Sequence, residues 1–71
     1  MNAKKPAKIY EINYKHPIHG SDIIGHDFLT VAAAVKEIKI IQAKSNSAYH
    51  EWLADAILWV ADAENGDIYW S

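Results

Sequence analysis

Three of the four histidines, His16, His19 and His26, lie close together near the start of the chain, with Asp22 and Asp27 in the same stretch. Imidazole and carboxylate groups are ligands that zinc and nickel accept. Their spacing matches no short metal motif such as H-E-x-x-H. If this stretch forms a strand, His26 shares a face with apolar residues and is equally a half-buried core histidine. A histidine-ligated metal protein is therefore an alternative interpretation rather than the preferred one.

Three carboxylates, Glu51, Asp55 and Asp62, share the polar face of a helix that we predict over residues 47–64. Glu51 and Asp55 are four apart, which makes them neighbours on that helix. Such a pair performs acid–base chemistry only when burial shifts the pKa of one carboxyl group. Leu58 is the only apolar residue on this side, so we expect a solvated acidic face, with docking on a basic partner as the alternative.

Nucleophilic catalysis finds little support among the remaining residues. The chain has no cysteine, and its serines, at positions 21, 45, 47 and 71, all lie in predicted turns, caps or the chain end. It contains no G-x-S-x-G motif, and its three glycines are too scattered to form a phosphate-binding loop. These patterns predict a non-enzymatic protein without a cofactor.

Size and composition indicate one small domain that gains from self-association. A chain of 71 residues buries only about 60% of its unfolded surface, so its stability is marginal unless something supplements the core. Disulfides are excluded because cysteine is absent. Hydrophobic residues make up 51% of the chain, which is too many for a disordered polypeptide.

Charge argues against a nucleic-acid binder. The formal net charge is −2 and arginine is absent, whereas such proteins are usually basic and use arginine for bidentate contacts. A weak nucleic-acid site remains the least favoured alternative, with lysines beside stacking tyrosines: Lys4, Lys5, Lys8 and Lys15 with Tyr10 and Tyr14. No signal-peptide pattern or long apolar run occurs, so we expect a soluble, cytoplasmic protein that does not bind membranes.

The first half of the chain predicts a β-hairpin and a helix. Residues 1–7 are polar and are expected to form a flexible leader to a single domain over residues 8–71. Alternating residues predict strands over 8–15 and 22–28, joined by a loop at 17–21, with a bulge at Gly25. A helix follows over residues 30–44.

Thr30 or Asp27 is the candidate N-cap of that helix. Its apolar stripe consists of Val31, Ala34, Val35, Ile38 and Ile41. Ile40 lies off the stripe and is expected near the surface. The segment Ser45-Asn46-Ser47 ends this helix and begins the next one.

The second half permits two topologies. The preferred one continues with an amphipathic helix over 47–64, a stop at Asn65-Gly66 and a short strand over 67–70, which makes a ββααβ fold of the α+β class. In the alternative, Asn65-Gly66 turns a hairpin between strands at 57–63 and 68–70, which makes a ββαββ fold. The alanines and acids of 47–64 favour the helix.

Aromatic residues suggest the function. Tyr49, Trp52 and Trp59 fall on one edge of the predicted helix, and this apolar arc is wider than the internal core requires. Tryptophan is enriched at binding hot spots. With Ile40 and Trp70 these residues form the predicted interface of a homodimer that also binds another protein. A regulator, an inhibitor and an adaptor all fit this prediction.

Overall fold

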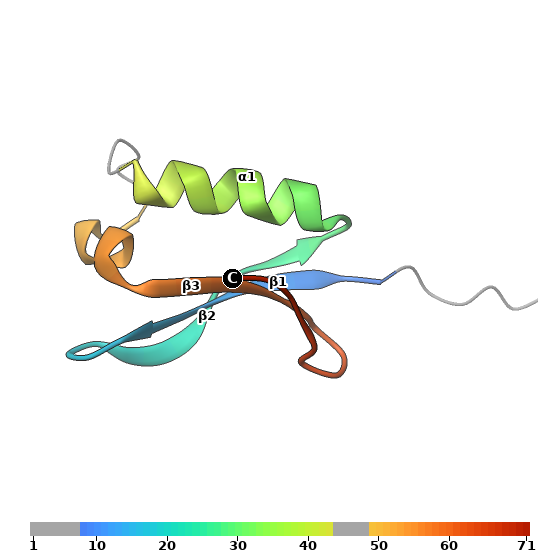
Figure 1. Cartoon of the computed structure of the whole chain (residues 1–71), viewed down its shortest axis with the longest axis horizontal. Helices are drawn as coiled ribbons and strands as arrows, with labels where there is room; N and C mark the ends of the chain where they lie inside the picture. Colours follow the sequence, from blue (N-terminus) through green and yellow to red (C-terminus); the bar gives the residue numbers. More distant parts are fainter. Residues whose placement is uncertain (1–7, 44–48) are drawn as a thin grey trace, which may run out of the picture.

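A computed structural model describes residues 8–43 and 49–71 of the chain. Its elements are β1 (Tyr10–His16), β2 (Gly20–Phe28), α1 (Val31–Gln42), a 3₁₀ helix η1 (Glu51–Asp55), β3 (Ile57–Asp62) and β4 (Ile68–Trp70). The strands form one antiparallel sheet in the order β2-β1-β3-β4, and α1 lies over one face of it (Figure 1). This is a small α+β domain, as expected. The predicted leader and the predicted break at Ser45-Asn46-Ser47 lie outside the described residues.

The N-terminal hairpin is confirmed, with a shorter loop than expected. Residues 17–19 connect β1 to β2, and His16 pairs with Gly20. Gly20 has a φ of 78°, which glycine adopts without a steric penalty, as three-residue hairpin loops require. The Nδ1 atom of His16 accepts hydrogen bonds from the amides of Ile18 and His19, at 3.1 and 3.2 Å. The histidine side chain thus holds the turn closed.

The predicted irregularity at Gly25 is also confirmed. Pairing of β1 with β2 shifts on both sides of the Ile12–Gly25 pair. Beyond it, Asp27 adopts a φ of 69°, a left-handed conformation that aspartate tolerates better than most residues. The expectation that His26 faces the core beside Phe28 is wrong, because the bulge breaks the alternation and leaves the His26 side chain 70% exposed.

Helix α1 begins and packs as its sequence predicts. Thr30 is the N-cap, and its Oγ1 accepts a 3.1 Å hydrogen bond from the amide of Ala33. Asp27, the other candidate, lies at the end of β2 and does not cap the helix. The buried residues of α1 are Ala34, Ile38 and Ile41, which belong to the predicted apolar stripe.

The predicted second helix over residues 47–64 is wrong, and the alternative ββαββ order is the observed one. A 3₁₀ turn, η1, occupies the first part of that stretch, and the rest forms β3, paired with both β1 and β4. Leu58, Val60 and Asp62 point to the helix side of the sheet and are buried. Trp59 and Ala61, which lie between them, are apolar too. The sequence therefore lacks the apolar–polar alternation that usually identifies a strand.

The loop between β3 and β4 differs from the two-residue hairpin considered for Asn65-Gly66. Among described residues only Asp27 and two glycines have a positive φ, so Asn65 does not adopt the conformation that a type I′ turn requires. Gly66 has a φ of 80° and donates a 2.8 Å hydrogen bond to the carbonyl of Asp62. The Asp62 amide donates in turn to the carbonyl of Asp67 at 2.8 Å. A longer loop with glycine at its left-handed position therefore closes the hairpin.

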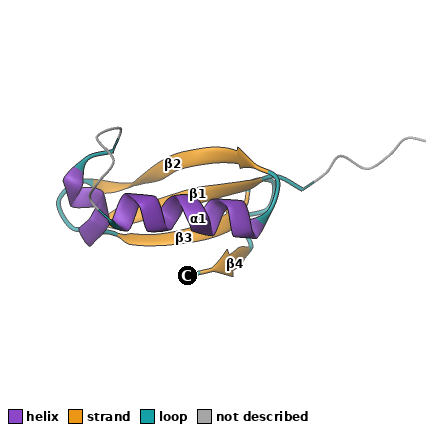
Figure 2. Ribbon diagram, turned by 90° about the horizontal axis from the view of Figure 1, so that it is seen from above, coloured by secondary structure: helices purple, strands orange, loops and turns teal. Residues whose placement is uncertain are grey.

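A single apolar core lies between α1 and the sheet. It contains side chains from β1, α1, η1 and β3: Ile12, Ala34, Ile38, Ile41, Leu53, Leu58 and Val60. From above, α1 runs over β1 and β3, and β4 lies to one side (Figure 2). None of the described helices is long and apolar enough to cross a membrane.

Candidate interaction surface

The face of the sheet opposite α1 carries no other described element (Figure 1). Side chains of directly paired antiparallel residues point to the same face, so the register defines this surface. We call it the open face. Its residues are Glu11, Asn13 and Lys15 of β1, Ile23 of β2, Ile57, Trp59 and Ala61 of β3, and Ile68 of β4.

Three isoleucines of the open face are well exposed, whereas Ala61 is buried. Ile57 is 64% exposed, Ile68 62% and Ile23 45%. Trp59 is half-buried and does not belong to the residues that pack against the core. Isolated apolar residues are common on protein surfaces, but a contiguous group on one sheet face marks an interaction site or an aggregation risk.

Asn13 occupies the middle of the open face. Its cross-strand neighbours are Ile23 on β2 and Trp59 on β3. Its Nδ2 atom is buried and makes no hydrogen bond with any described residue. Leaving a buried donor without an acceptor costs about 1–3 kcal/mol, so this amide lowers the stability of the domain at the centre of the open face.

Two charged residues of β1 flank Asn13 on the same face. Glu11 pairs with Ala61 and Lys15 pairs with Ile57, so the charges lie at opposite ends of the apolar patch. Neither forms an ion pair with a described residue. The open face therefore has a negative end, a middle in which Ile23 and Trp59 flank Asn13, and a positive end.

The residues of the predicted aromatic interface do not lie on one surface. Tyr49, Trp52 and Trp70 pack against the core on the helix side of the sheet, whereas Trp59 lies on the open face. Ile40 is half-buried on α1. The helical edge that was to unite these residues does not exist, because β3 is a strand.

Trp52 is the centre of an aromatic cluster at the end of the β1–β2 hairpin. The rings of His19 and His50 stack on it with centroid distances of 3.9 and 5.5 Å, and the rings of His16 and Tyr14 contact it edge-on at 5.2 and 5.4 Å. Such contacts stabilise by about 0.5–1.5 kcal/mol each beyond burial. This cluster holds η1 against the hairpin.

Two of the three predicted metal ligands lie together, since the rings of His16 and His19 are 4.8 Å apart, but His26 does not join them. His16 and His19 contact Trp52, while Nδ1 of His26 lies 3.0 Å from Oδ2 of Asp27 on the exposed side of β2. No group of three histidine, aspartate or glutamate residues in the described part of the chain is arranged to hold a metal ion.

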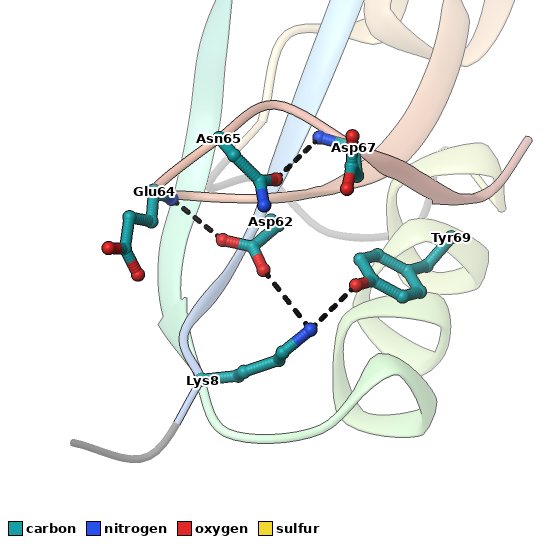
Figure 3. Close-up of polar contacts among 6 residues, drawn as sticks. All are labelled: Lys8, Asp62, Glu64, Asn65, Asp67 and Tyr69. Atoms are coloured by element: carbon teal, nitrogen blue, oxygen red, sulfur yellow. Dashed lines mark hydrogen bonds and ion pairs between the residues drawn. The ribbon is translucent and has the colours of Figure 1, made fainter. Parts of the chain in front are cut away.

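The predicted acidic face is also divided, because it depended on the second helix. Glu51 and Asp55 are exposed on η1, but Asp62 ends β3 and is only 3% exposed. The Asp62 carboxylate accepts a 2.8 Å hydrogen bond from the amide of Glu64, and its Oδ2 lies 3.6 Å from the Lys8 ammonium (Figure 3). Asp62 thus stabilises the start of the β3–β4 loop.

Lys8 also donates a 2.8 Å hydrogen bond to the hydroxyl of Tyr69, which raises the pKa of Lys8 (Figure 3). Tyr10 and Tyr14 pack against the core. Lys8, Tyr10 and Tyr14, which were proposed for nucleic-acid stacking, are therefore already engaged within the domain, whereas Lys15 is exposed on the open face. Lys4 and Lys5 lie outside the described residues.

The sequence-based prediction missed most of the open face. Ile23, Ile57 and Ile68 were not selected, nor was Asn13. The available signal was the Asn65-Gly66 hairpin, which would have assigned alternate residues of 57–63 to a second sheet face. Trp59 was selected, but as part of a helical edge.

Comparison with known proteins gives no further guidance. No protein-family model matches the chain, and neither curated proteins nor solved structures show significant similarity to it.

Proposed function

We propose that the protein is a non-enzymatic interaction module that forms a homodimer through its open face, and that it acts in the cytoplasm as a regulator, inhibitor or adaptor. The observation that carries the proposal is the exposed apolar patch of Ile23, Ile57 and Ile68 around Trp59. Covering this patch supplies the burial that a domain of this size lacks.

A second copy is the partner that the charge pattern favours. Consider a two-fold axis that lies between two facing sheets, runs across the strands and passes over Asn13. Such an axis reverses the strand direction, so Glu11 of one subunit faces the partner's Lys15, and the same contact occurs again at the other end. The open face is therefore complementary to itself in charge.

The same axis also determines which other side chains face each other. Ile57 lies level with Lys15, and Ala61 lies level with Glu11, so the exposed Ile57 faces the end of the partner's sheet where Ala61 is buried and offers no bulky side chain. Asn13 lies on the axis and therefore faces the partner's Asn13, as Trp59, its neighbour on β3, faces the partner's Trp59. A single pair of facing asparagines can also define the register of an interface.

The experiment compares two exposed isoleucines. Ile57→Lys places a charge in the proposed interface, and Ile18→Lys makes the same change in the β1–β2 loop, where Ile18 is 83% exposed. Sedimentation equilibrium should show a wild-type dimer, at least tenfold weaker dimerisation for Ile57→Lys, and an unchanged dimer for Ile18→Lys. This loss corresponds to about 1.4 kcal/mol or more.

Neither change removes a core contact, so circular dichroism and thermal unfolding should show both variants folded. A wild type that remains monomeric at high concentration contradicts the proposal. Equal dimerisation of wild type and Ile57→Lys places any dimer interface elsewhere and contradicts it as well.

A further inference from the structure

A second surface lies on the helix side of the sheet, between α1 and β4. It is an open groove of about 470 Å³ with an apolar lining. Its lining residues are Val31, Ala32, Val35, Lys36, Lys39 and Trp70. Val31, Val35 and Trp70 also pack against the core, so the floor of the groove continues the core to the surface.

The groove adjoins a free strand edge. β4 is the last strand in the sheet order β2-β1-β3-β4, and β3 is its only strand neighbour in the described structure. The side of β4 that faces away from β3 therefore presents backbone groups to which another strand can pair. Figure 2 shows β4 to one side of α1, with no described element beyond its outer edge.

Charge identifies the kind of strand that fits. Lys36 and Lys39 are three residues apart, so they are neighbours on α1 above the groove. Neither forms an ion pair or hydrogen bond with a described residue. A ligand at this position meets an apolar floor below and two ammonium groups above.

From these features we infer that the β4 edge and its groove bind an extended acidic segment of a partner protein by strand addition. The partner strand hydrogen-bonds to the outer edge of β4 and extends the sheet by one strand to the side of α1. One of its apolar side chains enters the groove against Trp70 and Val35, and acidic side chains two positions away contact Lys36 and Lys39. Main-chain pairing provides affinity in this mode, and the groove and the lysines provide specificity.

This surface is separate from the proposed dimer interface. The open face lies on the other side of the sheet, so a dimer leaves the groove and the β4 edge accessible. The two proposals therefore succeed or fail independently.

The test uses synthetic peptides with blocked ends. The probe has the pattern Thr-Glu-Thr-Val-Thr-Glu. In an extended strand its two glutamates and its valine therefore lie on one face. A matched peptide carries lysine in place of glutamate, and a third has the probe sequence with N-methylated amides that cannot donate to a strand. Amide chemical shifts in NMR titrations with ¹⁵N-labelled protein report both affinity and location.

We expect the acidic probe to shift the amides of β4 and of the groove side of α1, with saturable and salt-dependent binding. The lysine and N-methylated peptides should bind at least tenfold more weakly. Lys36→Glu combined with Lys39→Glu should weaken binding of the acidic probe at least tenfold, whereas Ile18→Glu, which adds a carboxylate to the exposed β1–β2 loop, should leave the affinity for the probe unchanged.

Absence of probe binding overturns the inference. Equal binding of the N-methylated peptide, or shifts confined to residues outside β4 and α1, also overturns it. A second probe is dodecanoate, a small amphiphile with an apolar chain and a carboxylate. If dodecanoate binds in the groove and the acidic peptide does not, the groove is a site for an amphiphilic small molecule and the strand-addition inference is wrong.

Discussion

The hydroxyl of Tyr49 donates a 2.5 Å hydrogen bond to Oε2 of Glu37, and this contact ties the segment before η1 to the middle of α1. The hydrogen bond, together with burial and the negative charge of Glu37, raises the pKa of Tyr49 to about 12. The neutral phenol is thus favoured in the folded state. Tyr49 therefore contributes to the core side of the domain rather than to an exposed aromatic edge.

Stability should consequently fall at high pH. In the unfolded chain a tyrosine loses its proton near pH 10, while the folded protein retains the Tyr49 proton to about pH 12. The contribution of Tyr49 is fully present below pH 10 and is lost as the pH rises from 10 to about 12. Urea unfolding at several pH values measures this loss.

The matched control is Tyr49→Phe, which retains the ring and removes the titrating hydroxyl. Its unfolding free energy should fall less over the same interval, although Lys8, whose pKa is also raised, still contributes to the decline in both proteins. Identical declines for wild type and Tyr49→Phe would contradict the assignment.

Asp62 should matter for stability through its hydrogen bond to the Glu64 amide. Asp62→Ala leaves that amide without its side-chain acceptor, and we expect a loss of about 1–3 kcal/mol in unfolding free energy. Asp62→Asn should cost less, because an amide oxygen can still accept. Chemical denaturation measures both variants.

The control for this prediction is Asp67→Ala, which removes an exposed carboxylate from the same loop. Surface changes of this kind usually alter stability by less than about 0.5 kcal/mol. If Asp62→Ala lowers the unfolding free energy no more than Asp67→Ala does, the buried carboxylate does not stabilise the loop.

Gly25 should resist substitution for a packing reason. A Cβ atom at this position would lie 3.0 Å from Cε2 of Phe28 and 3.4 Å from Cδ1 of Ile12. We therefore expect Gly25→Ala to destabilise the domain by about 1–3 kcal/mol in thermal or urea unfolding. The cost should shrink in a Phe28→Leu background, since the ring that causes the clash is gone. An equal cost in both backgrounds would contradict this explanation.

The first half of the fold follows from local signals, and the second half does not. Thr30 and the spacing of Ala34, Ile38 and Ile41 were sufficient to predict α1, since each signal acts within one helix. Residues 57–62 show no comparable local signal, because apolar and polar residues do not alternate along them. As part of a central strand they have apolar neighbours on both faces, and pairing with β1, far away in sequence, decides their conformation.

The candidate site depends on that same long-range pairing. Asn13 and Trp59 lie far apart in sequence and become neighbours only through the register of β1 and β3. Ile68 joins them through β4. Trp59 alone signalled an interaction surface, but its companions were identifiable only once the sheet order was known.

The most direct test of the proposed dimer exchanges the charges at the ends of the open face. Lys15→Glu places a carboxylate opposite the partner's Glu11, and Glu11→Lys places two ammonium groups opposite each other. Sedimentation equilibrium at low salt should show dimerisation at least tenfold weaker for each single variant, a change of about 1.4 kcal/mol. The double variant Glu11→Lys/Lys15→Glu restores both ion pairs and should dimerise as tightly as the wild type. Additive weakening in the double variant, or no effect of either single change, would contradict the two-fold arrangement around Asn13.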